Sequence, residues 1–148
     1  MRAALSLVLF LGFLGSADAY TVKDARGTEF EFSEPPRVAT VMPAVTESVF
    51  ALGAGDLLLA DSVFCSYPEE AKTKPKVGSF LNPDYEKIAE LKPDVFILPT
   101  LSDDRIESRL KKLGIKCFFL NSEGLENISK DIILLGDLLR RRQEAARI

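Results

Sequence analysis

Few side chains in this 148-residue chain could carry out covalent or metal chemistry. The sequence has no histidine, so it lacks the base of Ser-His-Asp and Cys-His catalytic systems and a common ligand of zinc and haem iron. Its two cysteines, Cys65 and Cys117, cannot build a four-thiolate metal site. Cys65 has no histidine to activate it as a nucleophile. The adjacent acids Asp103 and Asp104 open a predicted helix, where acids usually act as caps. We therefore expect no metal site, no cofactor and no enzymatic activity.

Nucleotide-binding and hydrolase motifs are also absent from the sequence. There is no Walker A loop and no G-x-S-x-G elbow. Gly53-Ala54-Gly55 lacks the third glycine of a dinucleotide fingerprint and follows a predicted helix, so we interpret it as a helix end. The net charge of -3 argues against the basic surface that binds nucleic acid. The 47% apolar and 28% charged residues are typical of a globular domain.

The first nineteen residues have the form of a secretory signal peptide. Met1-Arg2 is a positive start, Ala3 to Gly15 is an apolar run with few interruptions, and Ser16 to Ala19 end in an Ala-x-Ala pattern. The apolar run is shorter than the roughly 18 to 20 residues that span a membrane. We expect export to the periplasm with cleavage after Ala19.

The rest of the chain alternates between predicted strands and helices. A hairpin is expected over 20–32, and apolar runs predict strands over 37–42, 56–64, 94–98 and 115–120. The segments between them predict helices over 46–52, over 82–92 and from Ser102 or Asp103 to Leu113, and one helix is expected from 122 to 148. Thr46 is expected to cap the first helix and Asn82-Pro83 to open the second. This alternation predicts an α/β, Rossmann-like lobe with a parallel four-stranded sheet.

Ligands of such sheets bind beyond the carboxyl ends of the strands. The residues expected at those ends lie in the segments 42–45, 64–67, 99–102 and 121–122, and the loop 77–81 is placed to reach the same edge. This edge combines aromatic and other apolar side chains with few charges.

Six short motifs occur in order between Thr21 and Pro99. They are Pro-Pro-Arg-Val (35–38), Pro-x-x-Thr-Glu (43–47), Ala-Leu-Gly-Ala-Gly-Asp (51–56), Cys-Ser-Tyr-Pro-Glu-Glu-Ala (65–71), Val-Gly-Ser-Phe-Leu-Asn-Pro-Asp-Tyr-Glu-Lys-Ile (77–88) and Leu-Lys-Pro-Asp-Val (91–95). Together they resemble the amino-terminal lobe of the class III, helix-spined substrate-binding proteins of bacterial ABC importers for vitamin B12, ferric siderophores and haem. Within that family the motifs are most similar to those of the cobalamin binders.

The resemblance implies one lobe of a clamshell. The sheet would have strand order 2-1-3-4, with the hairpin before it and a long interlobe helix, cut short, after it. Residues 20–121 would form the lobe and residues 122–148 the start of the interlobe helix, with the second lobe absent. In this sheet Cys65 and Cys117 would lie three strand spacings, roughly 14 Å, apart. A disulfide needs a much shorter separation, so we expect two free thiols.

The resemblance also implies a function. The protein would capture a corrinoid or a ferric siderophore chelate and deliver it, as a monomer, to an ABC permease of the inner membrane. The ligand-binding residues are expected to be Phe64, Phe80, Tyr67, Val45 and Thr100. Glu86 matches the acidic residue by which the family docks onto arginines of the permease.

Two alternatives remain open at this point. Nitrogenase-like and chelatase proteins share this lobe architecture and handle metallocofactors as enzymes, although export and the lack of histidine argue against them. The chain could also be a truncated remnant with no function, whose exposed apolar helix face would favour aggregation. Among ligands, haem is less favoured than the corrinoid because this lobe offers no histidine.

Overall fold

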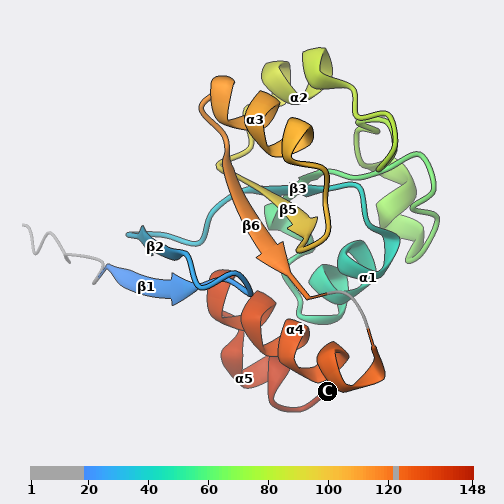
Figure 1. The fold of residues 1–148 in the computed structure, drawn as a ribbon. Helices are drawn as coiled ribbons and strands as arrows, with labels where there is room; N and C mark the ends of the chain where they lie inside the picture. The colour runs from blue at the N-terminus through green and yellow to red at the C-terminus, as the bar shows by residue number, and fades with distance from the viewer. Residues whose placement is uncertain (1–18, 122–123) are drawn as a thin grey trace, which may run out of the picture.

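The computed structural model describes residues 19–121 and 124–148 (Figure 1). The predicted signal peptide, apart from Ala19, and the predicted helix start at Ser122 lie outside these residues. Among the described residues no helix is both long enough and apolar enough to cross a membrane.

The described chain alternates between strands and helices, as the sequence predicts. The strands are β1 (Tyr20–Lys23), β2 (Glu29–Phe32), β3 (Val38–Thr40), β4 (Leu58–Ala60), β5 (Val95–Pro99) and β6 (Lys116–Leu120). The α-helices are α1 (Pro43–Ala51), α2 (Tyr85–Leu91), α3 (Asp104–Lys112), α4 (Leu125–Leu138) and α5 (Arg142–Ala145). Two short 3-10 helices, η1 (Gly55–Leu57) and η2 (Glu69–Thr73), flank β4.

Four parallel strands form the central sheet in the spatial order β4-β3-β5-β6. Val95 of β5 is in register with Val38 of β3 on one side and with Lys116 of β6 on the other. Counted along the chain, this order is 2-1-3-4, so the predicted topology is confirmed. All four carboxyl ends therefore point to the same edge of the sheet.

Both faces of the sheet are buried, which explains why its strands are continuous apolar runs. Val95 and Ile97 of β5 face one core, against α1, α4 and the hairpin, while Phe96 and Leu98 face the other, against α2 and α3 (Figure 1). None of these four side chains is exposed to solvent. The side chains of β6 alternate in the same way.

The predicted hairpin is confirmed as an antiparallel pair of β1 and β2 that packs beside the sheet. The Tyr20 hydroxyl donates a 2.6 Å hydrogen bond to the carbonyl of Leu138, and the Ala25 amide donates to the carbonyl of Phe119. The rings of Phe30 and Phe118 lie 5.5 Å apart between their centroids. These contacts fix the hairpin on the face that α4 also covers.

Two predicted helix starts are wrong. Helix α1 begins at Pro43 rather than at a Thr46 cap, because proline suits the first turn, where an amide has no helical partner. Thr46 is instead buried inside the helix, and its hydroxyl contacts the sulfur of Cys65 at 3.3 Å. Helix α2 begins at Tyr85, two residues after Pro83, with the Asp84 carboxylate accepting a hydrogen bond from the Lys87 amide.

The predicted strand over 56–64 is shorter in the structure. Its first residues form η1, β4 covers only Leu58–Ala60, and the chain turns away after Ser62. Asp61 continues the pairing with Lys76 as a single parallel bridge, not with β3. The apolar residues Val63 and Phe64, which suggested a longer strand, are exposed in a loop.

The prediction of one continuous helix over 122–148 is also wrong. Helix α4 ends at Leu138, Arg140 adopts a left-handed conformation with a φ of 53°, and α5 then packs back on α4. Gly136 permits this contact, because a methyl group placed there would lie 2.6 Å from the Cβ of Ala145. Arg140 and Arg141 therefore lie in the connection between the two helices, and Arg142 is the first residue of α5.

Candidate functional site

Loops beyond the carboxyl ends of the sheet expose several large apolar side chains to solvent. Five such side chains lie on the loops that follow β4 and β5 and on the loop before α2, and we call them the apolar rim: Val63 (56% exposed), Phe64 (70%), Tyr67 (68%), Leu81 (92%) and Leu101 (71%). Large apolar side chains exposed on loops at one edge of a sheet are typical of an interaction site.

Phe64 and Tyr67, two of the predicted ligand-binding residues, lie on the loop after β4 and point outward. Hydrogen bonds hold the loop backbone beneath them. The Phe64 amide donates a 3.1 Å hydrogen bond to the hydroxyl of Ser62, and the Val63 amide donates to the carbonyl of Gly78 at 2.9 Å. Two aromatic rings on a fixed backbone form a surface suited to a large planar ligand.

The other three predicted ligand-binding residues lie differently. Phe80 is half-buried and packs against the core beneath α2 and α3. Val45 is only 4% exposed and lines a mainly apolar cavity of about 490 Å³ between α1 and α4. Thr100 is half-buried, and its amide donates to the carbonyl of Leu120 at 2.8 Å. The structure thus places Phe64 and Tyr67 openly on the rim, and the other three mostly below it.

Leu81 and Leu101 lie in the segments 77–81 and 99–102 that were expected at this edge, but neither was among the predicted ligand-binding residues, although both are more exposed than Tyr67. The signal was available, because each is an apolar residue in a loop between a predicted strand end and a predicted helix start. A leucine in a loop is exposed at the surface when it packs in neither core.

A buried ion pair lies beneath the loop that carries Phe64. The carboxylate of Asp61 is completely buried, and the ammonium of Lys76 donates to its Oδ1 at 2.7 Å. Burial raises the pKa of Asp61 above its ordinary value even though Lys76 lies beside it. This pair could not be predicted, because no local pattern separates Lys76 from the other lysines of the loop 66–76.

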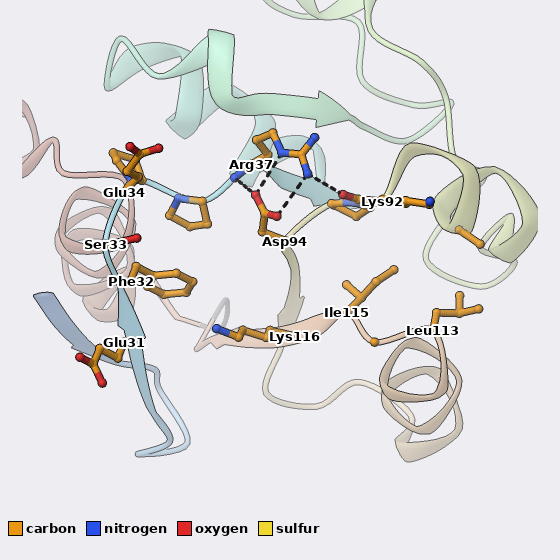
Figure 2. A pocket seen from close by; sticks show the side chains of 15 residues that line it. Glu31, Phe32, Ser33, Glu34, Arg37, Lys92, Asp94, Leu113, Ile115 and Lys116 are labelled. Carbon is orange, nitrogen blue, oxygen red and sulfur yellow. Dashed lines mark hydrogen bonds and ion pairs between the residues drawn. The ribbon is translucent and has the colours of Figure 1, made fainter. Parts of the chain in front are cut away.

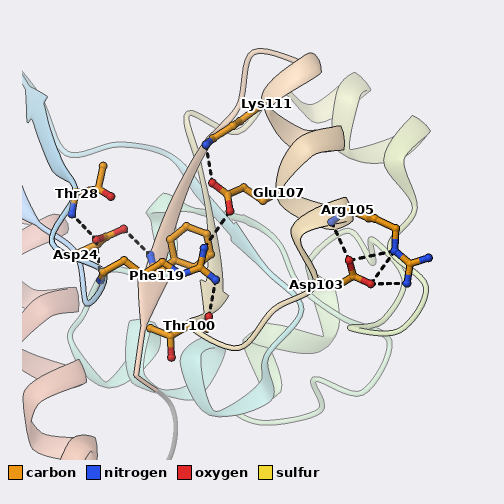
Figure 3. A network of polar contacts seen from close by, with 9 residues as sticks. Asp24, Thr28, Thr100, Asp103, Arg105, Glu107, Lys111 and Phe119 are labelled. Atoms are coloured by element: carbon orange, nitrogen blue, oxygen red, sulfur yellow. Dashed lines mark hydrogen bonds and ion pairs between the residues drawn. The ribbon is translucent and has the colours of Figure 1, made fainter.

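A polar network holds the loop after β5 against the hairpin (Figure 3). The Arg26 guanidinium lies 3.6 Å above the ring of Phe119, pairs with Glu107 at 3.0 Å and donates to the carbonyl of Thr100. The Asp24 carboxylate accepts hydrogen bonds from amides of the hairpin turn and, at 3.3 Å, from the Phe119 amide. These contacts fix the backbone immediately before Leu101.

One acidic side chain near the rim, Asp103, is paired with a base. The Asp103 carboxylate accepts hydrogen bonds from the backbone amide and the guanidinium of Arg105, and these bonds hold its pKa below the ordinary value (Figure 3). Asp103 is also the cap of α3, so the capping role predicted for it is confirmed. The charge of Asp103 is therefore neutralised close to Leu101 in the sequence.

A second hollow, of about 730 Å³, lies at the opposite, amino-terminal edge of the sheet (Figure 2). Arg37 and Asp94 form an ion pair there, with Nε and Oδ2 3.1 Å apart. Although partial burial raises the pKa of Asp94, the hydrogen bonds from Arg37 outweigh it and hold that pKa below the ordinary value. Because ligands of such sheets bind at the carboxyl ends, the apolar rim, and not this hollow, is the candidate binding site.

Both cysteines are free, as predicted, and both are buried. Cys65 is 3% exposed and lies under the rim loop, where its sulfur contacts the hydroxyls of Thr46 and Ser62. Cys117 lies in β6, where burial raises its pKa from 9.0 to about 11. Neither thiol is placed to act as a nucleophile. Among the described residues, no group of three or more His, Cys, Asp or Glu side chains could hold a metal.

The raised pKa of Cys117 predicts a specific pH dependence of stability. The folded state keeps the thiol proton up to about pH 11, whereas the unfolded chain releases it near pH 9.0. Stability from this group is therefore complete below pH 9 and declines as the pH rises through that window. Between pH 8 and pH 10 we expect the wild type to lose about 1 kcal/mol relative to Cys117→Ala in urea unfolding. Parallel pH profiles for the two proteins would contradict the assignment.

Glu86, the predicted docking residue, lies in the first turn of α2 with its side chain exposed. Glu90, one turn later on the same helix, is exposed as well, whereas Ile88 is fully buried in the core. The geometry leaves Glu86 accessible to a partner.

Comparisons with known proteins agree with this architecture. A family model described as "Periplasmic binding protein" matches residues 38–148. A vitamin B12-binding protein of Vibrio vulnificus (strain CMCP6) is 35% identical over 97 residues, which are 65% of this chain and 36% of that protein.

Two solved structures from Vibrio cholerae are similar in fold. Its periplasmic vitamin B12 binding protein matches with a TM-score of 0.67 and 29% identity, over 76% of this chain and 46% of that one. Its periplasmic haem-binding protein matches with a TM-score of 0.66 and 26% identity, over 75% of this chain and 44% of that one. These relatives are described as binding proteins, and this chain spans less than half of the length of each.

Proposed function

The chain belongs to the periplasmic binding proteins, in the helix-spined class, and on this premise we propose that it is the amino-terminal lobe of the substrate-binding component of an ABC importer. The lobe binds a corrinoid or a ferric siderophore chelate and presents it to a permease of the inner membrane. We assign residues 20–121 to the lobe and 122–148 to the start of the interlobe helix, of which α4 packs against the core of the lobe. The observation that carries this proposal is the apolar rim at the carboxyl edge of the sheet.

The chemistry of the rim favours a bulky, largely uncharged ligand. Phe64 and Tyr67 supply aromatic surface, Leu81 and Leu101 supply aliphatic surface, and Asp103 is neutralised by Arg105. A planar metal chelate gains buried apolar area and ring contacts on such a surface, and no bond is made or broken. Among the ligand classes, a corrinoid fits better than an anionic siderophore, which would favour unpaired basic residues.

The resemblance to haem binders makes haem the second candidate. The structural similarity to the haem-binding protein of Vibrio cholerae favours it, whereas the absence of histidine leaves this lobe without the usual axial ligand. Calorimetric titration of the chain with cyanocobalamin, a ferric hydroxamate and haemin tests the choice. Preferential binding of cyanocobalamin is expected, and no binding of any of the three would contradict the proposal.

Export and cleavage after Ala19 are part of the proposal. The pattern of residues 1–19 supports them, as do relatives described as periplasmic. Amino-terminal sequencing of the exported protein tests the cleavage, since the mature chain would begin at Tyr20.

The proposal places ligand capture and permease docking on different residues, so the two should be separable. Phe64→Ala is expected to weaken cyanocobalamin binding about tenfold, because it removes an exposed aromatic anchor. Glu86→Gln is expected to lower the capture of the loaded protein by permease in proteoliposomes, because it removes the charge offered to arginines.

Each substitution has a matched control. Leu113→Ala removes an exposed apolar side chain near the opposite edge of the sheet, and Glu90→Gln removes an exposed acid from the same helix as Glu86. Calorimetry measures ligand binding by the Phe64 and Leu113 variants, and a pull-down assay measures capture of the Glu86 and Glu90 variants by the permease. If Leu113→Ala weakened binding as much as Phe64→Ala, the rim would not be the ligand site.

A further inference from the structure

Lys76 joins three parts of the chain through one side chain. Its ammonium donates to the Asp61 carboxylate at 2.7 Å, to the Cys65 carbonyl at 3.0 Å and to the Ala71 carbonyl at 2.9 Å. A lysine has three N–H donors, so all of them are used. The three acceptors belong to the end of β4, to the loop that carries Phe64, and to η2.

The backbone on both sides of Lys76 is fixed by hydrogen bonds to Asp61. The Asp61 amide donates to the carbonyl of Pro75, and the Val77 amide donates back to the carbonyl of Asp61. Lys76 therefore extends from a paired segment toward a loop that belongs to neither a helix nor a strand. Of its three partners, the Cys65 carbonyl is the one between the two exposed rings of the rim.

Phe64 and Tyr67 cannot be held in place by packing, because about 70% of each side chain is exposed. The positions of the two rings therefore depend on the loop backbone. That backbone is held by the hydroxyl and the carbonyl of Ser62, which accept from the amides of Phe64 and Cys65, by the carbonyl of Gly78 and by the bond from Lys76 to Cys65.

Stability alone does not account for this arrangement. A buried ion pair often contributes little compared with an apolar pair of similar size, because removing both charges from water is unfavourable. Here Asp61 is fully buried, and its Oδ2 has no hydrogen-bond partner among the described residues. An apolar pair could fill the same space, but it could not bond the carbonyls of Cys65 and Ala71.

We infer that Lys76 is a positioning residue of the apolar rim, holding the loop 62–71 in its binding conformation before the ligand arrives. The ligand then loses less affinity to the ordering of that loop. The role of the loop in binding rests on the proposed function, whereas its order in the free protein does not.

A tryptophan placed in the loop can report its order, because the chain has no tryptophan of its own. Ser66→Trp puts the reporter at an exposed position between the two rings. In this background Lys76→Met is expected to lower the fluorescence anisotropy and to increase quenching by acrylamide. Lys72→Met is the control, since Lys72 belongs to η2 but bonds only the exposed Glu69.

Binding is measured on the same substitutions without the reporter. Lys76→Met is expected to weaken cyanocobalamin binding about tenfold, which corresponds to a loop that adopts its binding conformation about one-tenth of the time. Lys72→Met is expected to bind like the wild type.

The double variant Asp61→Asn, Lys76→Met separates positioning from simple destabilisation. It removes the buried carboxylate that Lys76→Met leaves unpaired, so its thermal midpoint is expected to recover. Its loop is expected to remain mobile and its affinity low, because the carbonyls of Cys65 and Ala71 still lack the ammonium. The double variant also serves as the test if Lys76→Met alone does not fold.

Two results would overturn the inference. One is a reporter that stays as ordered in Lys76→Met and in the double variant as in the wild type. The other is an affinity that recovers together with the thermal midpoint in the double variant. If the wild type bound none of the three ligands, the proposed function would fail, and the fluorescence would still decide whether Lys76 positions the loop.

Discussion

Replacing Gly78 with alanine is expected to lower the free energy of unfolding by about 3 kcal/mol or more. Gly78 has a φ of +83°, which an L-residue with a Cβ adopts only under strain. The added methyl group would also lie 2.3 Å from the carbonyl oxygen of Asn82 and 2.9 Å from the amide nitrogen of Asp84. Both are backbone atoms, so no side chain can rotate away to relieve the contact.

The same substitution should also damage the rim. The Gly78 carbonyl accepts the hydrogen bond from the Val63 amide, and the turn that follows carries Leu81. Asp84, one of the two residues that the methyl group would contact, caps α2. A shift of this turn therefore disturbs both rim loops and the first turn of the helix that carries Glu86.

Gly27→Ala is the matched control for Gly78→Ala. Gly27 also has a φ of +83°, but a methyl group there would meet nothing within 4 Å. Only the backbone strain remains, so we expect a loss of about 1 kcal/mol. Urea unfolding of the two variants measures the difference. Equal losses would mean that strain, not the contact with Asn82 and Asp84, determines the effect at Gly78.

The sheet could be predicted from the sequence because its signals are local and agree with one another. A clear helix boundary precedes each of the strands β5 and β6. Lys92 and Pro93 follow α2 before β5, and Gly114 follows α3 before β6. Strand order came from the family motifs, not from the runs themselves. The apolar runs predicted the four strands, and the motifs predicted their order in the sheet.

The errors arose where tertiary contacts override local preference. Thr46 is a good cap by type, yet its hydroxyl contacts Cys65 inside the protein. Val63 and Phe64 extend an apolar run, yet the chain leaves the sheet at Asp61 to pair with Lys76. Arg140 is of a type that favours a helix, yet it lies in a left-handed conformation after the end of α4, where the chain turns so that α5 packs back on Gly136.

The site could be predicted only in part, because some of its contacts join segments that lie apart in the sequence. Phe64 and Tyr67 were predicted to lie at this edge because the resemblance and the strand ends indicated the same loop, and both are exposed there. Lys76 is indistinguishable in sequence from Lys72 and Lys74, and only the fold places its ammonium between Asp61 and the Cys65 carbonyl. A role that depends on three acceptors from separate segments leaves no pattern in the residues around it.

Replacing Phe118 with alanine is expected to lower the free energy of unfolding by about 3–5 kcal/mol. The side chain is fully buried in the core between the sheet, α4 and the hairpin, and its ring packs against Phe30 of β2 at 5.5 Å. Its removal leaves a cavity that two strands and a helix surround, and a rigid wall of this kind closes only partly around an empty space.

The hairpin should respond more strongly to Phe118→Ala than the rest of the protein. A two-stranded hairpin is marginally stable by itself, so β1 and β2 depend on the core contact that Phe118 supplies. Hydrogen exchange of the Val22 and Phe30 amides should accelerate more than exchange in β5, whose side chains also pack on the opposite face. Phe64→Ala is the control, since that ring is 70% exposed and its loss should change stability by less than about 0.5 kcal/mol. Equal effects of the two substitutions would contradict the division of these phenylalanines between a structural core and a binding surface.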